Sequence, residues 1–212
     1  MKDGDTLTQS NQIGWECMPI ELIRALAIQK KAAARANVQL GLLESSIGKA
    51  IENTADDIIA GHLDAHFTQS VWQDGSGVQT DANMVDVLAR IPDVSARNIM
   101  LNQSAAESFA SAMHIALLSL GTGHLEPAQG RLREALSAKA ESFNAITVAG
   151  RAHLRDAASL TLGQSFVTFA HQVTQNEQRL DKAYNQLYEL ACNSNAHEGF
   201  DIAFCEAVSN FT

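Results

Sequence analysis

The chain has 212 residues, of which 46% are hydrophobic and 18% charged, a balance that predicts a packed globular protein rather than a disordered one. The 24 acidic and 15 basic residues give a formal net charge of −9, which disfavours a nucleic-acid or anionic-membrane surface. The sequence contains no run of about 18 apolar residues that would span a bilayer, and its first residues lack the apolar core of a secretory signal. A cytoplasmic protein is therefore expected.

Few prolines and few aromatic residues, together with long stretches of Ala, Leu, Gln and Glu, favour an all-α fold. Residues 1–17 are polar and lack periodicity, which predicts a flexible N-terminal arm. Apolar residues at near-helical spacing then predict a helix that ends near Gly41. A second helix, capped by Ser45 or Ser46 and ending at Gly61, is expected to form a helical hairpin with the first.

A glycine-rich turn interrupts the helical pattern between Phe67 and Thr80. A short helix is expected to resume at Asn83. After a proline-containing loop, a long helix with an apolar stripe is expected to end at the pair Gly121 and Gly123, because glycine is common just beyond a helix C-terminus.

Three elements are expected in the rest of the chain. A helix should cover about residues 125–144, residues 146–159 are strand-like or irregular, and a last long helix should begin near Thr161. The long-helix region starts near residue 98, so we predict an N-terminal helical domain at 18–98 and a second domain at 99–212.

Cysteine and histidine spacing gives little sign of a metal site. Cys17, Cys192 and Cys205 are odd in number and form no CxxC pair, so neither a disulfide framework nor a zinc site is indicated. His62 and His66 stand four residues apart, but a pair of this kind is weak evidence and is interpreted as structural. Three reduced thiols, no metal and no cofactor are expected.

Five local sequences, in a fixed order, point to a known family. They are MPIELIRALAIQKKAAARAN, LGLLESSIGKAI, ADDIIAGHLDAHFTQSVWQDGSGVQTDANMVDVLA, NQSAAESFASAMHIALLSL and GRAHLRDAASLTLGQSF. Between Met18 and about Leu190 the chain resembles the class II fumarases of the fumarase/aspartase family. The resemblance implies a fumarase-like N-terminal helical domain followed by an incomplete long-helix bundle, truncated relative to the family. It also implies reversible addition of water to fumarate, giving malate, at a site shared by three subunits of a tetramer.

The first motif keeps part of the substrate-binding set of the family. Ser76, Gln79 and Asn83 match it, and the resemblance implies that they bind substrate. Val78 stands where the family has a substrate-binding threonine, and Asp81 where it has an asparagine. The glycine-flanked turn could instead be retained only for its geometry, and the two interpretations have equal weight.

The next two motifs have lost further polar groups. Ser104 matches a substrate-binding serine, but Ala105 and Ala106 replace a serine and an asparagine. His153 matches the catalytic-site histidine, whereas Ala152 replaces the threonine before it. His153 is the candidate catalytic residue, although an inherited structural histidine is the preferred interpretation. One lost oxyanion-type donor costs about 3 to 4 kcal/mol of transition-state stabilisation.

The family's flexible GSSxMPxKxNP loop, which supplies the proton-abstracting serine, is not found in this sequence. We therefore expect the isolated chain to be inactive as a fumarase and to act as an oligomeric or regulatory partner. It would form a homo-oligomer, or a hetero-oligomer with an intact fumarase-like chain. One alternative is a lyase, acting on fumarate, malate or a related dicarboxylate, that is active only in a composite site with another chain. A second is a small-dicarboxylate-binding module that uses the turn at 75–79. Nucleic-acid and membrane partners are not expected.

Overall fold

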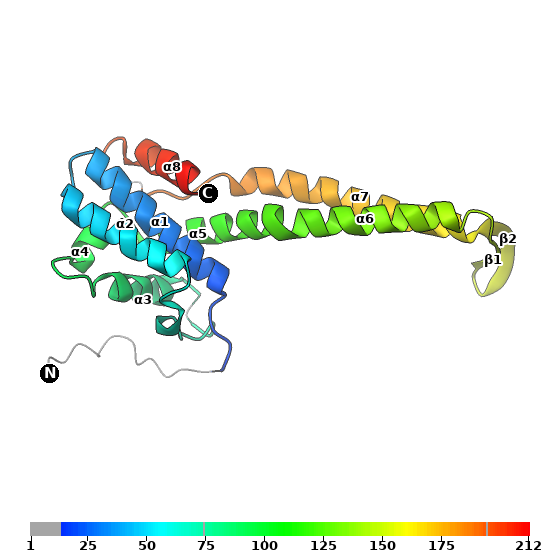
Figure 1. Cartoon of the computed structure of the whole chain (residues 1–212), viewed down its shortest axis with the longest axis horizontal. Helices are drawn as coiled ribbons and strands as arrows, with labels where there is room; N and C mark the ends of the chain where they lie inside the picture. The colour runs from blue at the N-terminus through cyan, green and yellow to red at the C-terminus, as the bar shows by residue number, and fades with distance from the viewer. Residues whose placement is uncertain (1–13, 74, 194) are drawn as a thin grey trace. The chain divides into compact units, whose positions relative to one another are not determined.

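The computed structural model describes residues 14–73, 75–193 and 195–212, so the first thirteen residues of the predicted arm lie outside the described residues. The elements, labelled in Figure 1, are α1 (Ile20–Gln39), α2 (Ser45–Ile59), α3 (Val78–Leu88), α4 (Ala96–Ile99), α5 (Ala105–Leu120), α6 (Glu126–Ser142), β1 (Thr147–Ala152), β2 (Arg155–Thr161), α7 (Leu162–Leu187) and α8 (Phe200–Phe211). A 3₁₀ turn at Asp64–His66 and a π-helical turn at Gly121–Leu125 complete the set. The predicted all-α fold is confirmed, with one two-stranded hairpin among the described residues.

The chain divides into two compact units. Unit 1 contains residues up to Leu117 together with Tyr188–Thr212, and unit 2 is Leu118–Leu187. The predicted boundary at residue 98 stays a prediction. Within the part of the chain that the structure describes, no helix is both long and apolar enough to cross a bilayer.

Unit 1 is built on the hairpin of α1 and α2, as the sequence predicts, and α8 packs on α1 (Figure 1). Alanines occupy most of the buried face of α1, and side chains this small let neighbouring helices approach closely. Near the end of α8 the Phe211 ring lies under the charged groups of Lys31 and Arg35, with ring-centroid distances of 4.2 and 4.5 Å. These cation–π contacts fasten α8 to α1.

Two predicted details in unit 1 are wrong. The third helix begins at Val78 rather than Asn83, because Gly77 takes a left-handed backbone conformation (φ 75°) and starts the helix directly. The cap of α2 is Glu44, not a serine, and it makes no side-chain capping hydrogen bond.

Unit 2 pairs α6 with α7, which run side by side and are joined through the β1–β2 hairpin (Figure 1). The predicted helix end at Gly121 and Gly123 is wrong, because the backbone stays helical through the π-helical turn into α6. Gly121 is required for packing instead. A Cβ atom at this position would collide with the ring of Tyr184 from α7.

Candidate functional site

The glycine-rich turn that contains Ser76 is held by packing and by hydrogen bonds of side chains. The side chain of Phe109 covers Gly77 so closely that no Cβ atom would fit there. Ser76 Oγ accepts a hydrogen bond from the backbone N–H of Val78 at 3.3 Å. The hydroxyl of buried Thr80 donates to Gln73 Oε1 at 3.0 Å, which ties the start of α3 to the preceding loop. Packing by Phe109 and the Thr80–Gln73 hydrogen bond thus hold the described residues of this turn in place.

Gln79 and Asn83 lie on α3, and both are half-buried. Asn83 Nδ2 donates to the backbone carbonyl of His66 at 3.4 Å, and His66 Nδ1 lies 3.1 Å from Arg90 Nη1. Asn83 therefore fixes the 3₁₀ turn to α3.

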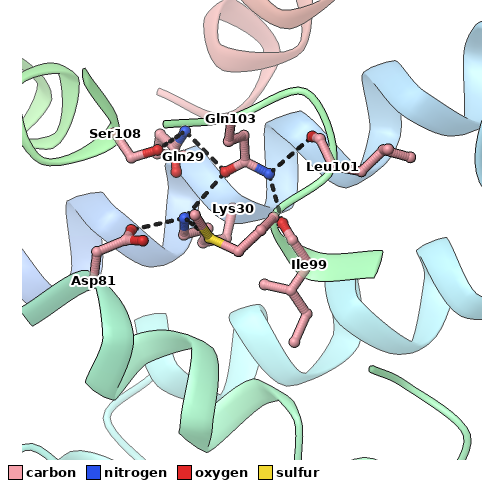
Figure 2. A network of polar contacts seen from close by, with 8 residues as sticks. Gln29, Lys30, Asp81, Ile99, Leu101, Gln103 and Ser108 are labelled. Atoms are coloured by element: carbon pink, nitrogen blue, oxygen red, sulfur yellow. Dashed lines mark hydrogen bonds and ion pairs between the residues drawn. The ribbon is translucent and has the colours of Figure 1, made fainter. Parts of the chain in front are cut away.

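A buried ion pair lies at the same end of α3. Lys30 Nζ on α1 is 2.7 Å from Asp81 Oδ1, and each side chain is 1% exposed or less (Figure 2). Burial lowers the pKa of Lys30 and raises the pKa of Asp81, while the attraction between the two charges opposes both shifts. The family motif has an asparagine at the position of Asp81. The Lys30–Asp81 ion pair therefore includes a carboxylate where the motif has a neutral amide.

Gln103 extends this network from α1 toward α5 (Figure 2). Its Oε1 accepts from Lys30 Nζ at 3.1 Å and from Gln29 Nε2 at 3.2 Å. Its Nε2 donates to the backbone carbonyls of Ile99 and Leu101, at 2.6 and 3.4 Å. Gln103 is thereby fixed in one orientation, because reversing its amide would place two donors against each other.

Ser104 directly precedes α5, and its carbonyl accepts the first backbone hydrogen bond of that helix, from Ser108 N–H at 2.9 Å. It lines a small crevice of unit 1 together with Gln29 and Glu107. The next two residues, Ala105 and Ala106, offer no side-chain donor. The resemblance implies a substrate-binding role for Ser104 and gives none to Gln29 or to Glu107, which replaces an aspartate of the motif.

His153 lies in unit 2, at the tip of the β1–β2 hairpin. It and Leu154 form the two-residue loop, both with positive φ (48° and 63°), and Leu154 is fully exposed. Such a loop matches the twist of the hairpin but is strained for residues other than Gly, Asn or Asp. Beside the tip, Arg151 Nη2 lies 3.6 Å from Asp156 Oδ1.

The predicted site residues are thus divided between the units. Ser76, Gln79, Asn83 and Ser104 belong to unit 1, and His153 belongs to unit 2. Their functional roles stay predictions. Within the described ranges, no cluster of three or more His, Cys, Asp or Glu side chains is arranged to hold a metal ion.

Comparison with known proteins places this architecture in a family. A sequence profile described as a lyase family matches residues 6–211. The chain belongs to this lyase family. It is 42% identical over 196 residues to a class II fumarate hydratase of Bradyrhizobium diazoefficiens, covering 86% of this chain and 41% of that protein. It is 37% identical to a mitochondrial fumarate hydratase of Rhizopus oryzae, covering 93% of this chain and 44% of the relative. The predicted resemblance to class II fumarases is confirmed.

Solved structures agree with the sequence matches. A class II fumarase from Schistosoma mansoni matches with a TM-score of 0.87 and 25% identity, covering 92% of this chain and 45% of that one. A cobalt-bound fumarate lyase:delta crystallin from Brucella melitensis also gives 0.87, with 28% identity and coverage of 94% and 48%. The chain therefore spans less than half the length of the relatives it matches.

Proposed function

We propose that this protein is a fumarase-like lyase-family member that does not hydrate fumarate with its own residues and acts in the cytoplasm as an oligomeric or regulatory partner. The observation that carries the proposal is the loss of polar groups inside otherwise matching motifs. Val78, Ala105, Ala106 and Ala152 stand at positions where the family motifs have donors. Val78 is 44% exposed at the start of α3, so its methyl groups occupy accessible surface at the motif turn.

The magnitude of these losses supports inactivity. Negative charge builds on a substrate carboxylate when a carbon-bound proton is removed, and donors aimed at that carboxylate stabilise the transition state. Removing a single such donor costs about 3 to 4 kcal/mol, a factor of 10² to 10³ in rate. The losses are not additive, but each acts in the same direction.

Exposed apolar side chains on unit 2 support the role of an oligomeric partner. Leu125, Leu132, Val167 and Phe169 are all more than two-fifths exposed. In the 26 residues of α7, only Gly163 and Tyr184 are buried within this chain. Helical bundles bury such faces against further helices, and a second chain supplies them where one chain has too few.

A second candidate function is a lyase whose site is completed by another chain. The observation in its favour is the exposed hairpin tip, where His153 and Leu154 keep a strained backbone and Leu154 has no cover. Strain of this kind persists where the surroundings or a function require it. In this reading the tip is inserted into a site on the partner chain.

The deciding experiment measures malate formation from fumarate by the purified chain. It is assayed alone and mixed with an intact class II fumarase that has been disabled at its catalytic serine. We expect no turnover in either case, and association of the two proteins in sedimentation. Turnover only in the mixture would establish the composite site instead, and turnover by the lone chain would refute inactivity.

Two further measurements separate the remaining readings. A monodisperse monomer in sedimentation, alone and in the mixture, would contradict the partner role. Thermal stabilisation by fumarate or malate would indicate a small-dicarboxylate-binding module, because a ligand that binds the native state alone raises stability. The variant Ser76→Ala serves as the control. It removes a hydroxyl of the motif turn and should reduce this thermal stabilisation.

A further inference from the structure

A small crevice in unit 1 contains polar atoms that the proposed function does not use. It is formed by α1, the start of α5, the segment after α7 and α8. Its free volume is about 10 Å³, which is room for one occupant of about the size of a water molecule. The residues that line it include Gln29, Glu107, Cys192, Phe200 and Phe204.

Two oxygen atoms of the lining residues are buried without a hydrogen-bond partner, Gln29 Oε1 and Glu107 Oε2. Gln29 is only 3% exposed, so bulk water does not satisfy its oxygen. A buried acceptor that lacks a donor is destabilising, and native structures rarely tolerate one. We therefore expect the crevice to hold an occupant that donates hydrogen bonds to these two oxygens.

The neighbours of Gln29 fix the orientation of its amide. Exchanging the amide oxygen and nitrogen would therefore not provide the unpaired oxygen with a partner. Gln29 Nε2 donates to Gln103 Oε1 at 3.2 Å and to Ser108 Oγ at 3.0 Å (Figure 2). Gln103 Oε1 is identified as an acceptor because it also receives a hydrogen bond from the Lys30 ammonium at 3.1 Å. Reversing Gln29 would place two acceptors together.

The charge of Glu107 and the aromatic residues of the lining favour a cation over a neutral donor. Glu107 has no ion-pair partner among the described residues. The rings of Phe200 and Phe204 stack with centroids 5.8 Å apart, and both line the crevice. A carboxylate attracts a cation through its charge, and aromatic rings that line the same crevice can add a weaker attraction. A water molecule would leave the carboxylate charge unbalanced.

We propose that this crevice binds one ammonium ion. Ammonium is about as large as water, carries one positive charge and has four N–H donors for Gln29 Oε1 and Glu107 Oε2. Potassium has the same charge and a similar radius but no N–H, so it tests whether hydrogen bonding contributes. A larger organic cation such as tetramethylammonium does not fit the free volume.

The test is thermal unfolding of the whole chain in ammonium, potassium, sodium and tetramethylammonium chlorides at constant ionic strength. Far-UV circular dichroism follows the loss of helix, because Trp15 and Trp72 are 97% and 64% exposed in the folded chain and their fluorescence would change little. Ammonium should raise the midpoint saturably, by about 3 to 5 °C at ten times its Kd. Potassium should give a smaller rise, and tetramethylammonium none.

Matched variants locate the effect. Glu107→Gln removes the charge and Gln29→Met the amide oxygen, and each should abolish the response to ammonium. Glu206→Gln removes an exposed carboxylate from α8 and should keep the full response. Equal responses to all four salts, or a potassium response as large as that to ammonium, would overturn the proposal.

A direct measurement on the unmodified chain avoids any dependence on variant folding. With ¹⁵N-ammonium, the bound ion should give a proton resonance in slow exchange with water and a nuclear Overhauser effect to the ring of Phe204. If the Phe204 ring shows an effect to water alone at saturating ammonium, the crevice is hydrated and the proposal fails.

Discussion

The buried Lys30–Asp81 pair gives the sharpest stability prediction. In Asp81→Asn, the neutral amide of the family motif replaces the carboxylate and leaves the Lys30 ammonium with no counter-charge at 0% side-chain exposure. Breaking one side of a buried pair costs about 3 to 5 kcal/mol. Lys30 retains Gln103 Oε1 at 3.1 Å and Met100 Sδ at 3.3 Å, which places the expected loss near the lower end, about 3 kcal/mol.

Deprotonation of Lys30 limits the cost of burying its unpaired charge and makes the loss of stability depend on pH. In the variant, burial is no longer opposed by Asp81, so the folded-state pKa of Lys30 falls further below its unfolded value. The sign follows from linkage: a lysine with a depressed folded pKa gains stability as pH rises toward the unfolded pKa of about 10.4. At pH 7 the cost of keeping Lys30 charged is limited to about 4.6 kcal/mol, the free energy of removing its proton. By pH 9 this limit falls to about 2 kcal/mol.

The assay is urea unfolding at pH 7 and pH 9, followed by far-UV circular dichroism. Asp86→Asn, on the exposed side of α3, is the matched control and should change the free energy of unfolding by less than about 0.5 kcal/mol. Lys30→Met combined with Asp81→Val should recover most of the loss, because Gln103 keeps its donor from Gln29. A loss below about 1 kcal/mol for Asp81→Asn, or a deficit that is larger at pH 9 than at pH 7, would refute the reasoning.

Two further predictions concern the thiols and unit 2. Burial raises the pKa of Cys192 to about 11, so iodoacetamide should alkylate Cys192 more slowly at pH 8 than it alkylates exposed Cys17. The alkylation rate of Cys192 should rise with pH up to about 11, and equal rates for the two thiols at pH 8 would contradict this prediction. Gly121→Ala should destabilise unit 2 by about 1 to 3 kcal/mol in a thermal melt followed by circular dichroism, since its Cβ meets Tyr184. The control is Gly123→Ala, which has open space around the new Cβ and should be neutral or stabilising by up to about 1 kcal/mol. Equal effects at both glycines would argue against the close contact between Gly121 and Tyr184.

Local sequence signals predicted most of the helices because they depend on neighbouring residues. The hairpin of α1 and α2 follows from apolar spacing and from Gly41 and Gly61, all of which lie within one stretch of sequence. The same reasoning wrongly predicts that the helix ends at Gly121. A glycine that ends a helix and a glycine that admits a ring from another helix look alike until the partner, Tyr184, is known.

The candidate site was less accessible to sequence reasoning, because its contacts join distant segments. Lys30 and Asp81 are separated by 51 positions, and Lys30 stands in an alanine-rich helix where a solvated lysine is the ordinary expectation. Asp81 was recognised only as a departure from a motif asparagine. The unpaired oxygens of Gln29 and Glu107 depend on which neighbouring groups are already satisfied, and a sequence does not record this.

The contact of Phe211 with Lys31 and Arg35 has a consequence for folding. Unit 1 is made of two stretches of chain between which all of Leu118–Leu187 is inserted. During synthesis, the surface of α1 that receives α8 has no cover until unit 2 and then α8 itself have been made. Doubling the length of a loop adds only about 0.6 kcal/mol to the entropic cost of closing it, so the insertion delays docking far more than it opposes it. The nascent chain therefore exposes this apolar surface for several seconds, at a synthesis rate of about 5 to 20 residues per second.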